Sequence, residues 1–398
     1  MKNLELYLHI PFCRKKCSYC DFLSAPATDE VQQRYVMQMI QEIRTVSKLY
    51  ADYEVVTVFI GGGTPSILDA ALVNSLLEQL YHDFHILPDA EITMECNPGT
   101  LDAGRLRAYK TSGINRLSMG MQSADDRELE MLGRIHTHEQ SVSNYMLARD
   151  MGFENINIDI ISSLPGQKLQ DYEYTLHEIL KLQPEHISAY SLIIEEGTPF
   201  YERFGQAEKL REIGKQQLLL PSEEEERGMY TLTKELLKSE GYQRYEISNY
   251  AREGFECRHN IGYWTRKDYL GIGLGAASFI GNVRFSNGSD LNEYLAECFS
   301  LEENEHREGF SSKWHIHREC LDTDAQMEEF MFLGLRMMCG VIAKDFYQQF
   351  SKSMEDVYED VLDKQLKQNL IKKTAHGYCL TDYGIDLSNY VMAQYLLG

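Results

Sequence analysis

Long apolar runs are missing from this sequence. No stretch approaches the roughly 20 consecutive apolar residues that a membrane-spanning helix requires. The first residues, MKNLELYLHIPF, also lack the charged flank, the long apolar run and the small-residue cleavage site of a secretory signal. We therefore expect a cytoplasmic protein with no stable insertion into a membrane.

Basic residues are also scarce. The chain carries 39 Lys and Arg against 61 Asp and Glu, which gives a formal net charge of -22. Proteins that bind nucleic acids or anionic lipid surfaces need basic footprints to displace counterions or to meet the opposite charge. The balance argues against a nucleic-acid partner and predicts an acidic surface that mainly serves solubility.

The nine cysteines do not read as the disulfide framework of a secreted protein. Their number is odd, and all but three are scattered along the chain. The exceptions are Cys13, Cys17 and Cys20, in the phrase HIPFCRKKCSYCDF. Since 398 residues with 43% hydrophobic content can bury a large core without covalent staples, this group of thiols points to chemistry rather than to stabilisation.

Six short apolar segments alternate with longer segments of helical periodicity. This alternation predicts an α/β fold whose strands are buried on both faces between helices. Six such units favour a partial (β/α)6 TIM-like barrel, and an eight-fold barrel or an open doubly wound sheet would have the same signature. The predicted strands are 4–10, 54–60, 90–96, 114–121, 156–161 and 186–194.

The second half of the chain no longer shows this regular alternation of strands and helices. Ser222 and Glu225 predict a capping box at the start of a helix. Residues 367–397 indicate a helix, a short hairpin and a second helix, a winged-helix-like pattern. We expect a barrel with its extension at 1–290 and a smaller, mostly helical domain at 291–398. The second domain has little excess of Lys and Arg, so packing or a lid role is expected there.

Two metal chemistries suit the cysteine loop. A structural zinc site needs four ligands in a closed tetrahedron, and His9 could join the thiolates as the fourth. No second Cys/His pair follows at finger-like spacing, which weighs against zinc. A [4Fe–4S] cluster takes thiolate ligands, and the C-x3-C-x2-C spacing lets one loop hold three of its irons. The fourth iron is then open to a small chelating molecule, as open metal positions are at catalytic sites.

This loop, placed after the first strand of a β/α barrel, resembles the signature of radical S-adenosylmethionine (radical SAM) enzymes. The phrases LYLHIPFC, YCDF and GGGTPS are similar to the branch that contains the oxygen-independent coproporphyrinogen III oxidases and the HemW heme chaperones. The resemblance implies that Cys13, Cys17 and Cys20 hold a [4Fe–4S] cluster with S-adenosyl-L-methionine on its open iron. In the family, one electron passed to the sulfonium gives methionine and a 5′-deoxyadenosyl radical.

Polar residues near the ends of the predicted strands suit a cofactor with an ammonium, a carboxylate and ribose hydroxyls. Glu95 offers an anionic acceptor, with a solvated loop carboxylate as the alternative. Arg134 offers a fork for a carboxylate, and Asp159 is costly within an apolar strand unless it has a partner. A glycine run lets backbone groups approach a ligand, or simply makes a turn. The resemblance implies S-adenosylmethionine contacts from Tyr7, Tyr19, Gly62, Gly63, Thr64, Glu95, Gln122, Arg134 and Asp159.

Two features favour the heme-chaperone side of this branch. The oxidases carry a longer N-terminal extension and a further cysteine two positions after the third ligand, whereas an Asp-Phe pair follows the third cysteine here. The segment CRHNIGYW resembles the HNxxYW motif of HemW proteins, which implies heme contacts from His259, Tyr263 and Trp264. Imidazole is a standard axial ligand of heme iron, and aromatic rings offer a flat apolar surface. A structural role is the alternative for His259.

Two departures from the family pattern accompany this resemblance. Ser162 and Ser163 precede LPGQ where the family often has Tyr-Gly, and Ala277 stands where a histidine is usual. The serine pair affects how the loop that follows it would contact a ligand. Ala277 affects how substrate or heme would be bound.

These observations predict a radical SAM-type heme chaperone that delivers heme to an acceptor protein, such as a respiratory enzyme. The alternative is an enzyme that converts coproporphyrinogen III to protoporphyrinogen IX by oxidative decarboxylation, and enzymatic activity stays open. A zinc-stabilised interaction protein is a third possibility. A flavodoxin- or ferredoxin-type electron donor is expected, and the basic residues Arg14, Lys15 and Lys16 beside the cysteines could receive it.

Overall fold

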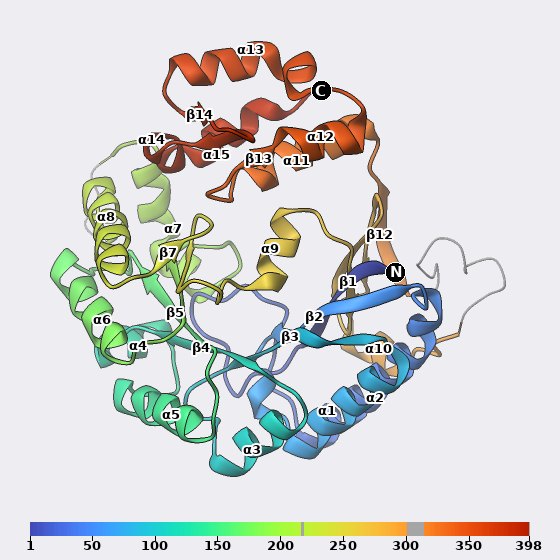
Figure 1. The fold of residues 1–398 in the computed structure, drawn as a ribbon. Coiled ribbons are helices and arrows are strands. Elements are labelled where there is room, and N and C mark those ends of the chain that lie inside the picture. Colours follow the sequence, from blue (N-terminus) through green and yellow to red (C-terminus); the bar gives the residue numbers. More distant parts are fainter. Residues whose placement is uncertain (216–218, 301–313, 398) are drawn as a thin grey trace.

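The computed structural model describes residues 1–215, 219–300 and 314–397, and its main feature is a large curved sheet with helices on the outside (Figure 1). Six parallel strands follow one another in chain order. They are β1 (Lys2–Ile10), β2 (Tyr53–Gly62), β3 (Ile86–Cys96), β4 (Arg116–Gln122), β5 (Ile156–Ser162) and β6 (His186–Ser191). The crossover helices are α1 (Asp29–Val46), α2 (Ala70–Asp83), α3 (Ala103–Thr111), α4 (Asp126–Leu132), α5 (His138–Asp150) and α6 (Leu169–Lys181).

Side-chain alternation along the strands separates the hydrophobic core from a polar interior. In β1, Leu4, Leu6 and Leu8 are fully buried in the main hydrophobic cluster together with residues of α1 and α2. Glu5 and Tyr7 alternate with them and face the concave side of the sheet, since successive side chains of a strand point to opposite faces. The core therefore lies between sheet and helices, and the functional groups collect inside the curve.

The second half of the chain extends the sheet at both edges. Its elements are α7 (Pro199–Glu212), α8 (Glu223–Ser239), β7 (Gln243–Arg244), β8 (Asn249–Ala251), α9 (Arg258–Trp264), β9 (Tyr269–Ile272), β10 (Ala277–Ile280), β11 (Val283–Asn287), α10 (Leu291–Ala296) and β12 (His315–Cys320). The predicted capping box is present, because Ser222 and Glu225 bond each other's backbone at the start of α8.

The resulting twelve-stranded sheet is open. Its order is β12-β11-β10-β9-β1-β2-β3-β4-β5-β6-β8-β7, and the two end strands do not pair with each other within the described residues. The predicted partial (β/α)6 barrel is therefore confirmed. Helix α9 enters its concave side, where Figure 1 shows it in the middle of the curve. No helix of the described ranges has the length and apolar character needed to cross a membrane.

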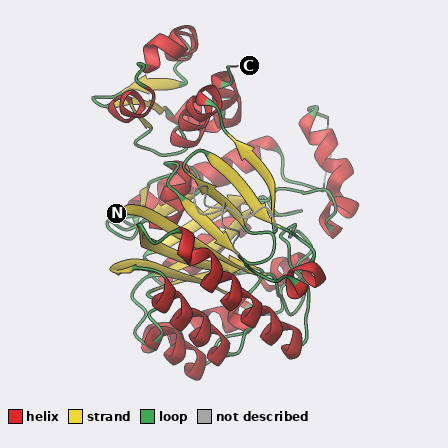
Figure 2. Ribbon diagram, turned by 90° about the vertical axis from the view of Figure 1, so that its right-hand side faces the viewer, coloured by secondary structure: helices red, strands yellow, loops and turns green. Residues whose placement is uncertain are grey.

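A small C-terminal domain sits beside the open sheet, at the top of Figures 1 and 2. It has its own hydrophobic cluster, which begins at Met327, and its sheet has the order β13-β15-β14. This arrangement agrees with the predicted winged-helix-like pattern. The elements are α11 (Thr323–Gly334), β13 (Val341–Ile342), α12 (Ala343–Phe350), α13 (Met354–Lys367), β14 (Ile371–Lys373), β15 (Gly377–Leu380), α14 (Asp382–Asp386) and α15 (Ser388–Met392).

The boundary between 1–290 and 291–398 stays a prediction. Strand β12 follows that boundary in the chain, yet it pairs with β11 of the large sheet. Arg336 of the C-terminal domain reaches the fully buried Glu246 at 3.5 Å, and the Met338 amide donates to the Tyr245 carbonyl at 2.9 Å. The contacts between the domains thus include polar groups as well as packing.

Candidate functional site

The three clustered cysteines lie on the loop between β1 and α1, at the carboxyl end of the parallel strands. Backbone hydrogen bonds fix this loop at several points: the Cys13 amide donates to Ala25, and the Ser18 amide donates to Leu132 at 2.9 Å. All three thiols are free and partly exposed. Active sites of β/α barrels form at this end, where successive loops meet.

Neighbouring donors already face two of the sulfurs. The Thr64 hydroxyl lies 3.3 Å from the Cys13 sulfur, and Nη1 of Arg134 lies 3.5 Å from the Cys17 sulfur. Burial raises the pKa of Cys20, and the nearby thiols add to this effect. Donors aimed at sulfur suit thiolates that carry charge on a metal cluster. The donor set therefore fits a [4Fe–4S] cluster.

The same loop does not have the geometry of a zinc site. No three Cys, His, Asp or Glu side chains in the described part of the chain converge on a single-ion site. A cubane does not need such convergence, because each cysteine binds a different iron. His9, the fourth ligand of the zinc alternative, donates from Nε2 to the Leu23 carbonyl at 2.9 Å and accepts at Nδ1 from Tyr7 at 3.0 Å. Both of its ring nitrogens are occupied.

Glycines at the end of β2 bring two functional loops into direct contact. Gly62 has φ 110°, a conformation that favours glycine, and a Cβ there would lie 2.5 Å from the His9 ring. A Cβ on Gly63 would lie 2.6 Å from the Phe12 carbonyl oxygen, next to Cys13. The Gly63 amide donates to the Ile10 carbonyl at the end of β1, and the Thr64 amide donates to the Phe12 carbonyl of the cysteine loop. The GGGT segment therefore supports that loop.

Gly63→Ala tests this close approach. The added methyl would meet backbone atoms that cannot rotate away, so we expect the cysteine loop to shift. Overpacking of this kind costs about 1–3 kcal/mol of stability. If the whole cost falls on the cofactor-binding conformation of the loop, S-adenosylmethionine affinity should fall about 5- to 150-fold, with lower iron content after reconstitution. Gly288→Ala is the matched control, because nothing lies within 4 Å of a Cβ at that position. Wild-type iron content and affinity in Gly63→Ala would contradict the interpretation.

Carboxylates line the interior just below the cysteine loop. Oε2 of Glu95 accepts from the Gly62 amide at 2.9 Å. Burial raises the pKa of Glu95 to about 8, with a further contribution from Asp159, while the Gly62 bond opposes the rise. Asp159 accepts from Asn157 at 2.8 Å and Ser118 at 3.2 Å, and burial raises its pKa as well. A bound ammonium group would favour the ionised forms of both carboxylates.

Arg134 connects several predicted cofactor contacts. Its Nη2 donates to the Gly120 carbonyl at 2.6 Å and to Oδ1 of Asn97 at 3.0 Å, while its Nε is buried with no partner in the described structure. Gln122 ends β4 beside it with φ 70°. Tyr19 also lies close to Arg134, and burial raises the pKa of its phenol. An unpaired guanidinium donor in this position fits the carboxylate expected from the cofactor.

One residue of this site was missed by sequence reasoning. Asn97 accepts from Arg134, and its Oδ1 also accepts from Nδ1 of the buried His136 at 2.9 Å. The signal was available, since an asparagine directly after a strand is at the functional end of a barrel. Asn97 thus fixes the orientation of Arg134.

The residues predicted to contact heme lie deeper in the same interior, on α9. His259 is 1% exposed, and its ring nitrogens lie 2.7 Å from the Thr57 hydroxyl and 3.0 Å from the Tyr263 hydroxyl. Burial lowers the pKa of His259 to about 3, so the imidazole is neutral. Trp264 lies beneath the Arg336 guanidinium, 4.2 Å from the ring centre. In this conformation His259 is the satisfied histidine of the structural alternative.

A row of rings joins the two ends of the interior. Tyr7 stacks on Phe59 with 6.3 Å between ring centres, and Phe59 stacks on His259 with 5.1 Å. Tyr263 follows at 4.9 Å from His259. The cofactor end and the predicted heme motif are therefore connected through packed side chains.

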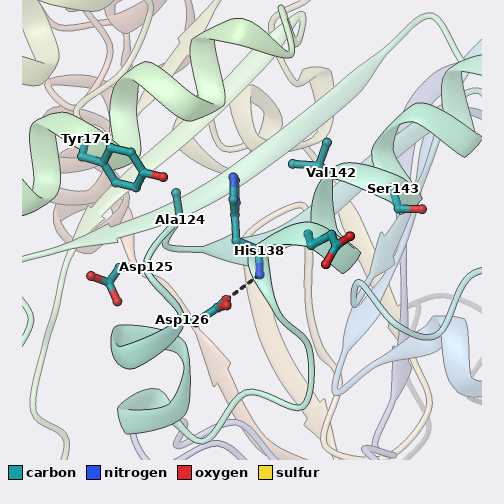
Figure 3. Close-up of a pocket in the computed structure, with 8 residues that line it drawn as sticks. Ala124, Asp125, Asp126, His138, Val142, Ser143 and Tyr174 are labelled. Atoms are coloured by element: carbon teal, nitrogen blue, oxygen red, sulfur yellow. Dashed lines mark hydrogen bonds between the residues drawn. The ribbon is translucent and has the colours of Figure 1, made fainter.

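A surface groove lies elsewhere, among α4, α5 and α6. Its volume is about 670 Å³, and Figure 3 shows Asp125, Asp126, His138 and Tyr174 around it. The His138 amide donates to Asp126 at 2.8 Å, the dashed line of that figure. None of the residues predicted for the cluster, S-adenosylmethionine or heme lines this groove.

Comparison with known proteins agrees with this geometry. Residues 7–179 match the family model described as the radical SAM superfamily, and residues 321–387 match the HemN C-terminal domain. The chain is 34% identical to a protein named heme chaperone HemW from Lactococcus lactis subsp. lactis, covering 100% of this chain and 98% of the relative. The heme chaperone HemW of Escherichia coli is 33% identical, with 99% and 98% covered.

The chain belongs to the HemW family. The identification confirms the predicted radical SAM superfamily and branch. Among solved structures, coproporphyrinogen III oxidase (HemN) from Escherichia coli has a TM-score of 0.81 at 24% identity, covering 100% of this chain and 90% of that one. At this identity the likeness establishes the shared fold.

The two departures from the family pattern occupy different surroundings. Ser163 is buried with φ 61° directly after β5, so the strand end is held in a left-handed turn. Ala277 is exposed at the start of β10. The HemW family assignment rests on similarity along the whole chain and does not depend on either position.

Proposed function

We propose that this chain is a radical SAM-type heme chaperone, which binds a [4Fe–4S] cluster, S-adenosyl-L-methionine and heme and passes heme to an acceptor protein. The observation that carries the proposal is the end-to-end similarity to proteins named heme chaperone HemW. The polar interior, with its free cysteines at one end and the HNxxYW segment at the other, supports it.

In this proposal the loop residues Cys13, Cys17 and Cys20 hold the cluster. The cluster and S-adenosylmethionine together supply one-electron chemistry at the sulfonium when both are bound. The residues of the chain bind and orient the cluster and S-adenosylmethionine. Thr64 and Arg134 lie against the sulfurs. The remaining predicted contacts would hold S-adenosylmethionine: Tyr7, Tyr19, Gly62, Gly63, Glu95, Gln122 and Asp159.

Heme binding at His259 would require a local change of structure. The ring must give up its bond to Thr57 or to Tyr263 before either nitrogen can reach iron. The neutral imidazole is the form that ligates a metal, so no proton has to leave it. We infer that α9 shifts when heme binds, and that Tyr263 and Trp264 then offer their rings to the porphyrin.

Two assays on the reconstituted protein test the function. We expect heme to bind stoichiometrically, measured by its absorbance, and to be passed on to a heme-free acceptor. We also expect no protoporphyrinogen IX when coproporphyrinogen III, S-adenosylmethionine and a reductant are supplied. Formation of that product would replace the chaperone with the decarboxylating enzyme, and failure to bind heme would reject the proposal outright.

His259→Ala tests the axial ligand. Loss of the imidazole should weaken heme binding about tenfold or more and change the ligand-dependent part of the heme absorbance spectrum. His177→Ala, an exposed histidine on α6, is the control. An unchanged spectrum in His259→Ala would leave this histidine with its structural role only.

The family relationship does not specify the electron donor, the heme acceptor or the cellular location, and we propose each of them. A flavodoxin- or ferredoxin-type donor would approach the cysteine loop, where Arg14, Lys15 and Lys16 are exposed on an otherwise acidic chain. Opposite charges at such a patch would speed encounter. We propose a cytoplasmic location, with a respiratory enzyme as one class of heme acceptor.

A further inference from the structure

A small cavity lies where α9 and strands β9 to β11 meet helix α11 of the C-terminal domain. Its volume is about 220 Å³. Tyr269, Phe279 and Arg284 form a row across the strands, because Tyr269 pairs with Phe279 and Phe279 pairs with Arg284. Tyr263 and Trp264 line the same cavity. The cavity therefore adjoins two of the three residues predicted to contact heme.

Arg266 contributes a buried guanidinium to this cavity. It follows α9 with φ 56°, a backbone conformation that favours glycine over arginine. Its side chain is 4% exposed and lies over the Phe279 ring, 5.1 Å from the ring centre. Nε donates to Glu329 at 3.2 Å. Both Nη atoms, which carry the other donors, are buried with no hydrogen-bond partner in the described structure.

The charges around the cavity do not cancel. Glu329 faces two guanidinium groups, since its other oxygen lies 2.8 Å from Nη2 of Arg284. One carboxylate thus serves both Arg266 and Arg284. The indole nitrogen of Trp264 is a further buried donor without a partner among the described residues. Arg284 is 38% exposed and keeps some contact with water, whereas the unpaired donors of Arg266 and Trp264 are buried at a cost. The cavity therefore suits a ligand that brings an anionic oxygen.

We propose that Arg266 and Arg284 bind a propionate carboxylate of heme. This inference rests on the heme-chaperone function proposed above and names the group by which the ligand is held. A carboxylate matches the planar fork of a guanidinium. The cavity is smaller than the roughly 300–1,000 Å³ of pockets that enclose whole ligands, so it holds a substituent while the macrocycle lies against α9. Tyr269 and Phe279 supply the apolar walls beside that substituent.

Heme and heme dimethyl ester, which lacks the free carboxylates, distinguish this contact from general heme binding. Both are titrated into the full chain and into Arg266→Gln. We expect the wild-type chain to bind heme about tenfold more tightly than the ester, as for a hydrogen bond to a charged group. Arg266→Gln should lose about tenfold for heme and almost nothing for the ester. Arg258→Gln is the matched control, an exposed arginine at the other end of α9.

The outcomes separate the inference from the proposed function. Equal binding of heme and ester by the wild-type chain would overturn the carboxylate contact and leave heme binding intact. Equal losses for both ligands in Arg266→Gln would show that Arg266 acts only on the structure of α9, which also overturns it. Arg284→Gln, which keeps the Arg266–Glu329 pair, should repeat the selective loss. If the wild-type chain binds neither ligand, the chaperone function itself fails.

Discussion

Replacing Cys17 with alanine should abolish the iron–sulfur cluster while leaving the chain folded. Cys17 lies partly exposed on a loop whose backbone is fixed by bonds on either side, at Cys13 and at Ser18. The hydrophobic core does not include it. A cubane held by three thiolates has no spare protein ligand, so removing one leaves two, and the resident cluster should be lost.

The measurement is iron and sulfide content together with visible absorbance after anaerobic reconstitution. We expect the cluster absorbance to vanish in Cys17→Ala, and S-adenosylmethionine affinity to fall with it. Cys298→Ala is the matched control, because Cys298 is an exposed cysteine far along the chain. Full iron content in Cys17→Ala, or zinc bound in its place by the wild-type chain, would contradict the cluster assignment.

Replacing Glu5 with glutamine should stabilise the cofactor-free chain at alkaline pH. Glu5 is 3% exposed inside the sheet, and its Oε2 has no hydrogen-bond partner in the described structure. Burial raises its pKa to about 9, with Glu91 adding to the rise. The folded chain thus holds a proton on Glu5 at pH values where the unfolded chain has already released it.

This difference sets the direction of the pH effect. Between pH 4.5 and about 9 the folded state binds more protons than the unfolded state, so the free energy of unfolding falls as pH rises. One such proton costs about 1.4 kcal/mol per pH unit. Glutamine is neutral at every pH and removes this loss. Glu95 and Glu42, whose pKa values rise to about 8 and about 7, contribute smaller losses of the same sign.

Urea unfolding of the wild-type chain and Glu5→Gln at pH 5.5, 7 and 8.5 measures the effect. The variant's advantage should be smallest at pH 5.5 and grow by about 1 kcal/mol or more for each pH unit. Glu30→Gln, an exposed carboxyl on α1, should show no such growth. An advantage that is constant with pH would mean that Glu5 is already ionised in the folded chain.

The parallel core of the fold followed from sequence pattern. Strands such as β1 and β5 are largely buried on both faces, and their short segments rich in apolar residues stand out between the longer segments of helical periodicity. The strands added at the edges of the sheet and the helix inside its curve were harder to predict. Strand β12 pairs with β11 at long range, and α9 is a helix of seven residues inside the curve. Neither has a local signal, because tertiary packing decides where short elements lie.

Some residues of the candidate site could also be predicted from the sequence, and others only from the fold. Cys13, Cys17 and Cys20 are close in sequence, so their spacing was sufficient to find them. The contact between Glu95 and the Gly62 amide joins two strands and required the fold. Arg266 carried no motif and became visible only through its burial and its unpaired donors.

The row of rings from Tyr7 to Tyr263 would make the two proposed ligand sites thermodynamically dependent on each other. If heme draws His259 out of its stack on Phe59, then Phe59 loses packing on one face, and Phe59 is the ring on which Tyr7 stacks at the cofactor end. Whatever factor S-adenosylmethionine imposes on heme affinity, heme must impose on S-adenosylmethionine affinity in turn. Loading and release of heme could then be followed by measuring the affinity of the chain for S-adenosylmethionine.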